Sequence, residues 1–438
     1  MIIPTSVWTR RLAVWVAAST ILSACSGGAP AASPTAPPSQ PTNAPQPFPS
    51  LSSAATLMQE TAVAIVKPTT VPTAAPTATL LPTIAPTEAM MGTPEEMGTA
   101  EGMVPEVPVD RSKLAKELHL YNWSEYIDET IFDDFQKEYG VKVIEDNFAS
   151  NEEMIAKLRA GNPGYDLIVP SDYAVEILAK ENLLLKLDKS LIPNLQNINP
   201  ANLKLYYDPN NDYTAPYQWG TTGIAYNTKN FPQPPDSSAV LFDPKQVCKY
   251  KGKVSMLDDE REVIGAALRY KGYSVNDTDP AHLKEVEDIL LKQKDCLAGY
   301  NSDNFNETLA AEEVVLAHAW SGGAALATQS NENIAYFIPK EGGVIWQDNI
   351  AIPKGAPNAY TANVFINFLL RPDEGAKISE YTLYLTPNNA AKEALSDDVK
   401  ELLAQFEPDD ATRQRLEWLK KAENTTIYSD VWTRVKSK

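Results

Sequence analysis

Five separated stretches of the chain offer an aromatic ring face, a carboxylate, or both. They are Trp123-Ser124-Glu125-Tyr126, Ser171-Asp172-Tyr173, Asp259-Glu260-Arg261-Glu262, Trp320 and Trp346-Gln347-Asp348. Ring faces attract ammonium groups and cover methylene groups, and carboxylates neutralise positive charge. None of the five stretches carries a His, Cys or Ser placed for bond-breaking. These residue types therefore predict binding of a ligand that is cationic at spaced points and apolar in between.

The elements predicted around the first two stretches alternate between strand and helix. Strand-like segments at residues 118–123, 141–144 and 165–169 are separated by helical segments, one of which opens with the capping box of Ser150 and Glu153. This order predicts a parallel sheet with helices on both faces. Ligands of such sheets bind beyond the carboxyl ends of the strands, which is where both stretches fall.

A second alternating segment is predicted in the C-terminal half of the chain. Strand-like segments at residues 253–257, 314–320 and 346–352 carry the other three stretches, and residues 361–370 form a helix before Arg371-Pro372. The sheet motif therefore appears twice, and the fold class predicted from the pattern is α/β.

The first 24 residues have the pattern of a secretion signal. Arg10 and Arg11 precede an apolar segment at residues 12–22, which is too short to span a bilayer comfortably. Leu22-Ser23-Ala24-Cys25 then resembles the lipobox of a bacterial lipoprotein signal. The resemblance implies cleavage before Cys25 and lipid on its sulfur, whereas an ordinary secretion signal with a chance Cys is the alternative.

Residues 25–111, which begin with the lipidated Cys25, are predicted to be a disordered tether. The segment is rich in Ala, Pro, Thr and Ser and is almost uncharged until Glu95. It cannot bury enough apolar surface to offset its ordering entropy, and its prolines favour an extended chain. We expect it to hold a folded domain away from a membrane, with a glycosylated stalk as a variant.

The net charge and the cysteine content limit which classes of partner and cofactor are expected. The net charge of −19 makes nucleic acid an unexpected partner and suits a cationic ligand, although an acidic surface also serves solubility. In an oxidising compartment, Cys248 and Cys296 form a disulfide or remain two buried thiols. No clustered His accompanies them, and residues 208–212 lack the Gly and distal Glu of a calcium loop. We expect no metal and no cofactor.

The folded part of the chain resembles the spermidine/putrescine-binding proteins of bacterial polyamine ABC transporters from about Leu118 onwards. The motifs that carry the resemblance are YNWSEY, YDLIVPSDY, DPNNDYTAPYQWGTTGIAYN, YKGKVSMLDDEREV, YNSDN, AWSGGA, PKEGGVIWQDNIAIP, INFLLRP and YLTPNNAAKEAL. It implies a two-lobed α/β solute-binding protein, in which each lobe is a mainly parallel sheet flanked by helices. Crossing hinge segments join the lobes, and the ligand lies in the cleft.

The resemblance also implies how the chain divides between the lobes. Residues 112–222 with about 347–395 would form lobe 1, and residues 223–346 with about 396–438 would form lobe 2. Hinge strands are expected near residues 220–225 and 339–347, with a third contact around residues 384–394. The implied protein is not an enzyme. It is a monomer, lipid-anchored at the outer face of the cytoplasmic membrane or in the periplasm, which delivers a polyamine to an ABC permease.

Carried over one at a time, the family's ligand-binding positions fall on twelve residues of this chain. They are Trp123, Ser124, Glu125, Tyr126, Ser171, Tyr173, Asp259, Glu262, Trp320, Trp346, Asp348 and Tyr384. The resemblance implies rings and a carboxylate around one ammonium end from the first four, an acidic pair at Asp259 and Glu262, and a further carboxylate at Asp348. No catalytic residue is implied.

The resemblance favours spermidine over putrescine. Glu125 and Trp346 match the spermidine pattern, and Ser321-Gly322-Gly323 lacks the extra Asp of members that look putrescine-selective. The family's spermidine binders also use a Gln near the C-terminus, where this chain has Thr433, so that contact is not carried over.

Two other functions share some of these features. Trp platforms with paired carboxylates also describe a carbohydrate-binding or glycoside-cleaving protein, although no acid–nucleophile pair appears by motif. A polyamine sensor domain would bind the same ligand and signal to a different partner. Motifs of nucleotide-binding, zinc-protease and serine-hydrolase sites are absent from the sequence.

Overall fold

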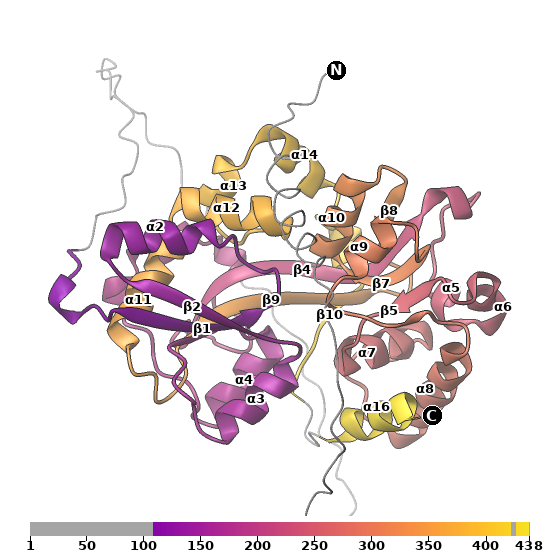
Figure 1. The fold of residues 1–438 in the computed structure, drawn as a ribbon. Helices are drawn as coiled ribbons and strands as arrows, with labels where there is room; N and C mark the ends of the chain where they lie inside the picture. The colour runs from indigo at the N-terminus through magenta and orange to yellow at the C-terminus, as the bar shows by residue number, and fades with distance from the viewer. Residues whose placement is uncertain (1–107, 422–425, 438) are drawn as a thin grey trace, which may run out of the picture. The chain divides into compact units, whose positions relative to one another are not determined.

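The computed structural model describes residues 108–421 and 426–437, which fold around one mixed sheet (Figure 1). The expected signal peptide (1–24), the lipidated Cys25 and the tether up to residue 107 lie outside the described residues. None of the helices in the described ranges is long and apolar enough to cross a membrane.

Ten strands of the described residues form the sheet. They are β1 (Glu117–Trp123), β2 (Lys142–Phe148), β3 (Leu167–Ile168), β4 (Thr214–Asn227), β5 (Val254–Met256), β6 (Gly299–Tyr300), β7 (Leu316–Trp320), β8 (Ile334–Phe337), β9 (Gly343–Ala351) and β10 (Leu416–Trp418). Their order is β2-β1-β3-β9-β4-β7-β5-β6, with β10 beside β9 and β8 beside β4.

Helices cover both faces of this sheet (Figure 1). The α-helices are α2 (Thr130–Tyr139), α3 (Asn151–Arg159), α4 (Asp172–Lys180), α5 (Ala239–Phe242), α6 (Pro244–Val247), α7 (Glu260–Tyr270), α8 (Pro280–Lys294), α9 (Phe305–Ala310), α10 (Ser321–Ser330), α11 (Ala359–Leu369), α12 (Pro372–Thr382), α13 (Asn389–Ala394), α14 (Asp397–Ala404), α15 (Asp410–Arg413) and α16 (Ile427–Ser437). The short 3-10 helices are η1 (Arg111–Lys113), η2 (Lys189–Leu191), η3 (Pro193–Asn197), η4 (Pro200–Asn202), η5 (Thr228–Asn230) and η6 (Cys248–Tyr250).

The first third of the fold has the strand and helix order predicted from the sequence. β1 pairs in parallel with both β2 and β3, so the expected parallel sheet is present. The side chain of Ser150 accepts a hydrogen bond from the Glu153 backbone N–H at 3.2 Å, and Glu153 Oε2 accepts from the Ala149 N–H at 3.1 Å. Gly140 ends α2 with a φ of 75°, which a residue without Cβ adopts readily.

β4 and β9 join the two halves of the sheet. Residues 214–222 of β4 pair antiparallel with residues 344–351 of β9, and residues 222–226 of β4 then pair with β7. Figure 1 shows these two long strands running side by side between the helical layers. They include most of the expected hinge strands, and they connect the two predicted sheets into one.

Two further segments connect the halves. Around residues 384–394, where a third contact was expected, the Tyr384 ring packs against the backbone of Gly322 in the other half, and the Leu385 carbonyl accepts a hydrogen bond from the Trp219 N–H of β4 at 2.9 Å. A crossing that the sequence did not predict follows β10, which pairs in parallel with β9. Beyond it, the Lys420 carbonyl accepts from Arg261 Nη2 at 3.0 Å, and the Lys421 N–H donates to Glu176 Oε2 at 3.1 Å.

The apolar core divides between the two halves. The largest cluster packs β5 and β7 against α7, α8 and α16, with Val263, Leu290 and Leu316 fully buried. Two other clusters lie around β1 and β3, one with Phe135 and Phe365 and the other with Tyr121 and Met154. A disulfide joins Cys248 and Cys296, so the structure contains the cross-link and not two free thiols.

Candidate ligand-binding site

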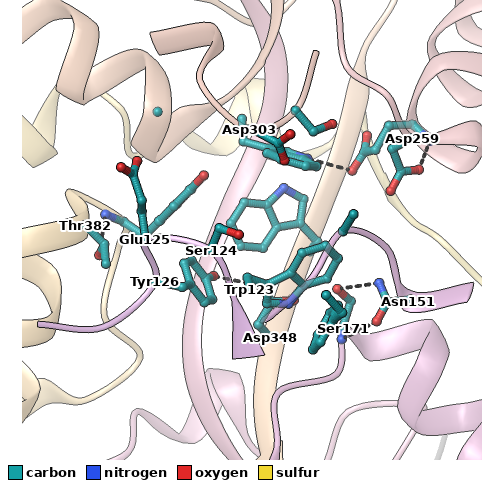
Figure 2. Close-up of a pocket in the computed structure, with 18 of the residues that line it drawn as sticks. Trp123, Ser124, Glu125, Tyr126, Asn151, Ser171, Asp259, Asp303, Asp348 and Thr382 are labelled. Carbon is teal, nitrogen blue, oxygen red and sulfur yellow. Dashed lines mark hydrogen bonds between the residues drawn. The ribbon is translucent and has the colours of Figure 1, made fainter. Parts of the chain in front are cut away.

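One pocket is lined by all twelve residues predicted from the sequence. It lies where β1 and β3 end in one half and where β5 and β7 end in the other, so that both halves contribute to its walls. Figure 2 shows Glu125 and Asp259 on opposite sides of the pocket, with Trp123 between them. The predicted position at the carboxyl ends of the strands is therefore the observed one.

Eight aromatic side chains line the pocket, and the indole N–H groups of its tryptophans donate hydrogen bonds that hold these rings in place. Trp123 Nε1 donates to the Val169 carbonyl at 2.9 Å, and Trp346 Nε1 donates to Thr222 Oγ1 at 3.2 Å. The Trp123 and Trp320 rings, from opposite halves, lie 6.4 Å apart in an edge-to-face arrangement. With their polar edges engaged, these rings offer mainly their faces and apolar edges to a ligand.

Tyr384 completes the aromatic wall on the β9 side. Its ring centroid lies 5.3 Å from the ring of Trp346 and 5.3 Å from the ring of Tyr126, each in edge-to-face geometry. The ring also packs directly against the backbone of Gly322, where an added Cβ would lie 2.4 Å from ring carbons. This close packing fixes the ring in one position.

Asp348 is a buried carboxylate with one satisfied and one unsatisfied oxygen. The Tyr126 hydroxyl donates to Oδ2 at 2.7 Å (Figure 2). The other oxygen, Oδ1, is buried and accepts no hydrogen bond of normal geometry from the described residues. Burial raises the pKa of Asp348 to about 6, although the Ser171 and Tyr126 hydroxyls act in the opposite direction.

Glu262 has the same arrangement in the other half of the pocket. Its Oε1 accepts from Trp320 Nε1 at 3.4 Å, while Oε2 is buried without a hydrogen-bond partner in the described ranges. Burial, and then the charge of Asp259, raise the pKa of Glu262 to about 8. Asp259 itself caps α7, since its Oδ1 accepts from the Arg261 and Glu262 N–H groups at 2.9 and 3.0 Å.

Glu125 adopts a backbone conformation that is uncommon for residues other than glycine. Its φ is 54°, in the left-handed region, which costs of order 1 kcal/mol or more and often marks a functional site. The turn places Glu125 on the pocket wall near Thr382, as Figure 2 shows.

Ser171 and Tyr173 hold the start of α4 to the neighbouring helix. Ser171 occupies the N-cap position but makes no capping hydrogen bond; its hydroxyl instead accepts from Asn151 Nδ2 at 3.0 Å. The Tyr173 hydroxyl donates to Glu152 Oε1 at 3.0 Å. Ser171 lines the pocket, and helix capping does not account for a Ser at this position, because its hydroxyl makes no capping hydrogen bond.

Several lining residues were not predicted. They are Phe148, Ala149, Asn151, Asp172, Ser302, Asp303, Phe305, Asn306, Gly323, Leu326, Thr382 and Leu419. Ser302 and Asp303 belong to the YNSDN motif, so this motif was the signal that could have identified them. Asn151 and Leu419 have no such signal in the sequence. Within the described ranges no group of three or more His, Cys, Asp or Glu side chains is placed to hold a metal ion.

Comparisons with known proteins identify the family. Residues 130–406 match the model of the bacterial extracellular solute-binding proteins. The spermidine/putrescine-binding periplasmic protein of Salmonella typhimurium is 40% identical over 323 residues, which cover 73% of this chain and 91% of that protein.

Solved structures agree with this match. A spermidine/putrescine ABC transporter substrate-binding protein of Streptococcus pneumoniae is 35% identical with a TM-score of 0.61, covering 74% of this chain and 99% of that one. A lipoprotein of Treponema pallidum is 31% identical with a TM-score of 0.64, covering 74% and 100%.

The chain belongs to the bacterial extracellular solute-binding protein family. The resemblance to the spermidine/putrescine-binding proteins, inferred from the motifs, is confirmed, and so is the two-lobed α/β fold.

Proposed function

We propose that this protein is the extracytoplasmic polyamine-binding component of an ABC transporter, with spermidine as its preferred ligand and putrescine as a second one. Its relatives are binding proteins of transporters and not enzymes, and their names place them in the periplasm or outside the cell. The twelve residues carried over from the family are the proposed ligand-binding residues, and all of them line one pocket.

The observation that supports this function most strongly is the pair of unsatisfied carboxylate oxygens, Asp348 Oδ1 and Glu262 Oε2. Buried polar atoms in folded proteins are nearly always hydrogen-bonded, and a buried charge without a partner costs several kcal/mol. An ammonium group supplies both the missing donors and the missing charge. Because the oxygens lie in different halves of an aromatic-walled pocket, a ligand with spaced ammonium groups and methylenes between them satisfies both.

The carboxylates favour a triamine. Among the residues carried over from the family, Glu125, Asp348 and the pair of Asp259 and Glu262 supply three acidic positions, which suits the three ammonium groups of spermidine better than the two of putrescine. Asp172 and Asp303 also line the pocket and add to its negative charge. Polyamine amino groups stay protonated at neutral pH, as a lysine side chain does.

Delivery to a permease follows from the division of contacts between the lobes. A ligand that contacts both lobes binds the closed arrangement more tightly than an open one, and so shifts the population towards closure. A membrane permease can then recognise the closed form. We place lobe 1 at residues 112–222 with about 347–395, and lobe 2 at residues 223–346 with about 396–438.

We also propose that the protein is a monomer anchored by lipid on Cys25, with residues 1–24 as the signal peptide and the following segment as a tether. The lipobox-like sequence supports this, and the Treponema pallidum relative is itself called a lipoprotein. Metabolic labelling with a fatty acid tests it: the wild-type chain should incorporate the label, and Cys25→Ser should not.

Calorimetric titration with spermidine, putrescine, arginine and maltose tests the ligand class. Spermidine should saturate the protein at one site, with putrescine binding more weakly and arginine and maltose giving no binding heat. Saturation by maltose without any response to the amines would instead support the carbohydrate-binding alternative.

A further inference from the structure

A second cavity adjoins the ligand pocket beside Asp259. Its volume is about 350 Å³, and it shares Ala149, Asp259, Ser302 and Asp303 with the pocket as common lining residues. The two cavities therefore share one wall, and a ligand group beside Asp259 in the pocket lies next to residues that also line the second cavity. Neither the twelve predicted residues nor the comparisons assign a role to the rest of its lining.

The remaining lining residues have the chemistry of an ammonium site. Glu152, from the first lobe, and Asp258 and Glu260, from the second, add three carboxylates. The Tyr300 and Trp432 rings pack edge to face at 4.9 Å on the same cavity. The Tyr300 hydroxyl is buried and has no hydrogen-bond partner in the part of the chain that the structure describes. Rings combined with carboxylates bind alkylammonium groups.

One alkylammonium group of the protein, that of Lys436, already contacts three of the lining residues, although Lys436 does not itself line the cavity. Lys436, in the last turn of α16, places Nζ 2.8 Å from both carboxylate oxygens of Asp258. The same Nζ lies 4.8 Å from the centroid of the Tyr300 ring and 5.5 Å from that of Trp432. Three lining groups of the cavity thus hold a primary ammonium supplied by the protein itself.

The contact of Lys436 is one that a ligand can displace. The Lys436 side chain is 37% exposed and that of Asp258 is 43% exposed, whereas Asp259 is 6% exposed. Exposed ion pairs contribute little to stability, because water competes for both partners.

We propose that this second cavity is a subsite for a further ammonium group of a longer polyamine, a tetraamine of the spermine type, and that Lys436 limits its use by holding the same groups. The inference rests on the proposed polyamine-binding function. Diamines and triamines fill the main pocket and leave Lys436 in place. A fourth ammonium group has to displace the Lys436 ammonium from its contacts with Asp258 and with the Tyr300 and Trp432 rings. Because one primary ammonium replaces another, the exchange gives little net affinity, and Lys436 therefore sets the upper length of the preferred ligand.

Lys436→Gln tests this inference, with Arg434→Gln as its matched control. Both substitutions remove one positive charge from α16, but Arg434 Nε pairs with Glu287 of α8 at 2.9 Å, and Glu287 does not line the cavity. Calorimetry on the full-length chain gives the affinity for spermine relative to that for spermidine. This ratio should rise about three- to tenfold in Lys436→Gln, as expected when one exposed ion pair and its ring contacts no longer compete. It should change less than twofold in Arg434→Gln.

Asp258→Asn, added to Lys436→Gln, supplies an independent arm of the test. With Lys436 already removed, loss of this carboxylate should weaken spermine binding severalfold relative to Lys436→Gln alone and leave spermidine within twofold. An unchanged ratio in Lys436→Gln, or an equal rise in both α16 variants, overturns the subsite. If the wild-type chain binds spermidine normally in that experiment, only this inference fails; if the wild type binds no polyamine, the proposed function fails with it.

Discussion

At the scale of single residues, we propose that two buried carboxylates, Asp348 and Glu262, determine the binding chemistry. One oxygen of Asp348 accepts a hydrogen bond from the Tyr126 hydroxyl, and one oxygen of Glu262 accepts from the Trp320 indole N–H. The other oxygen of each carboxylate has no hydrogen bond of normal geometry among the described residues. Their pKa values are raised to about 6 and about 8, mainly because burial disfavours the charged form. A cationic ligand reverses this penalty, which explains why such costly groups are placed in the pocket.

Replacing Asp348 by Asn should weaken spermidine binding by about 2–5 kcal/mol, because the substitution leaves a buried ammonium without its counter-charge. Calorimetric titration measures the change. Asp236→Asn removes the same charge from an exposed side chain paired with Lys340 and serves as the control. Wild-type affinity in Asp348→Asn would exclude Asp348 from the site.

Polyamine binding should release protons near neutral pH. Bound ammonium groups favour the charged forms of Glu262 and Asp348, so their pKa values fall and affinity rises as the pH increases from 6 to 8. Titrations in two buffers with different ionisation enthalpies measure the proton release at pH 7. Glu262→Gln should reduce it, and binding without any proton release would contradict the assignment.

Ligand affinity is expected to rise with pH, whereas the stability of the ligand-free protein should fall, because of the raised pKa of Glu262. Between the ordinary pKa of a glutamate, 4.5, and the value of about 8 for Glu262, the folded chain binds more protons than the unfolded chain. This group therefore lowers the free energy of unfolding as the pH rises through that window.

At the scale of elements, local sequence signals predicted the first part of the fold well. Ser150, Glu153 and Gly140 act through neighbours a few residues away, so the start of α3 and the end of α2 could be inferred from their chemistry. The twelve proposed site residues were inferred from the resemblance and not from the pattern alone. Asp259 shows why. It caps α7 with two hydrogen bonds, and the sequence alone could not distinguish an Asp that caps a helix from one that binds a ligand.

The connections between the two halves were harder to predict. All fourteen residues of β4 are buried, so the strand shows no alternation that would mark where its partner changes from β9 to β7. β10 has only three residues and pairs with residues 343–345, far away in the sequence. Leu419, which follows it, reaches the pocket only because of that pairing. Long-range pairing of short segments leaves no local signal.

Gly220→Ala should disturb the hinge and the pocket together. An added Cβ on this β4 residue would lie 2.6 Å from Ser321 Oγ and 2.7 Å from Trp346 Cζ2, so the Trp346 ring has to move. We expect weaker spermidine binding and a loss of about 1–3 kcal/mol in the free energy of unfolding. Gly299→Ala is the control, because a Cβ there meets nothing within 4 Å. Equal effects of the two substitutions would argue against close packing at Gly220.

The disulfide should affect stability and leave binding unchanged. Cys248 and Cys296 are 48 residues apart, and neither lines the pocket. In the chain-entropy model, replacing both by Ser lowers the free energy of unfolding by about 4 kcal/mol. Denaturant unfolding and calorimetry on the folded variant separate the two effects, and a large loss of affinity in the folded variant would contradict the prediction.

At the scale of the whole molecule, the pocket depends on β4 and β9, which connect the two lobes and fix their relative position. The Trp123 ring meets Trp320 across the pocket, and Asp348 and Glu262 come from opposite sides of the hinge. Ligand binding therefore couples to the arrangement of the lobes. A ligand at about one hundred times its dissociation constant adds roughly 2.7 kcal/mol to the free energy of unfolding.

The central claim is that positive charge on a flexible chain, and not its apolar length, is what the pocket recognises. Titration of the full-length chain with spermidine and with octane-1,8-diol, a neutral chain of similar length, tests it most directly. Spermidine should saturate one site with an affinity that falls as salt is added, and the diol should give no binding. Tight binding of the diol together with no response to spermidine would contradict the account.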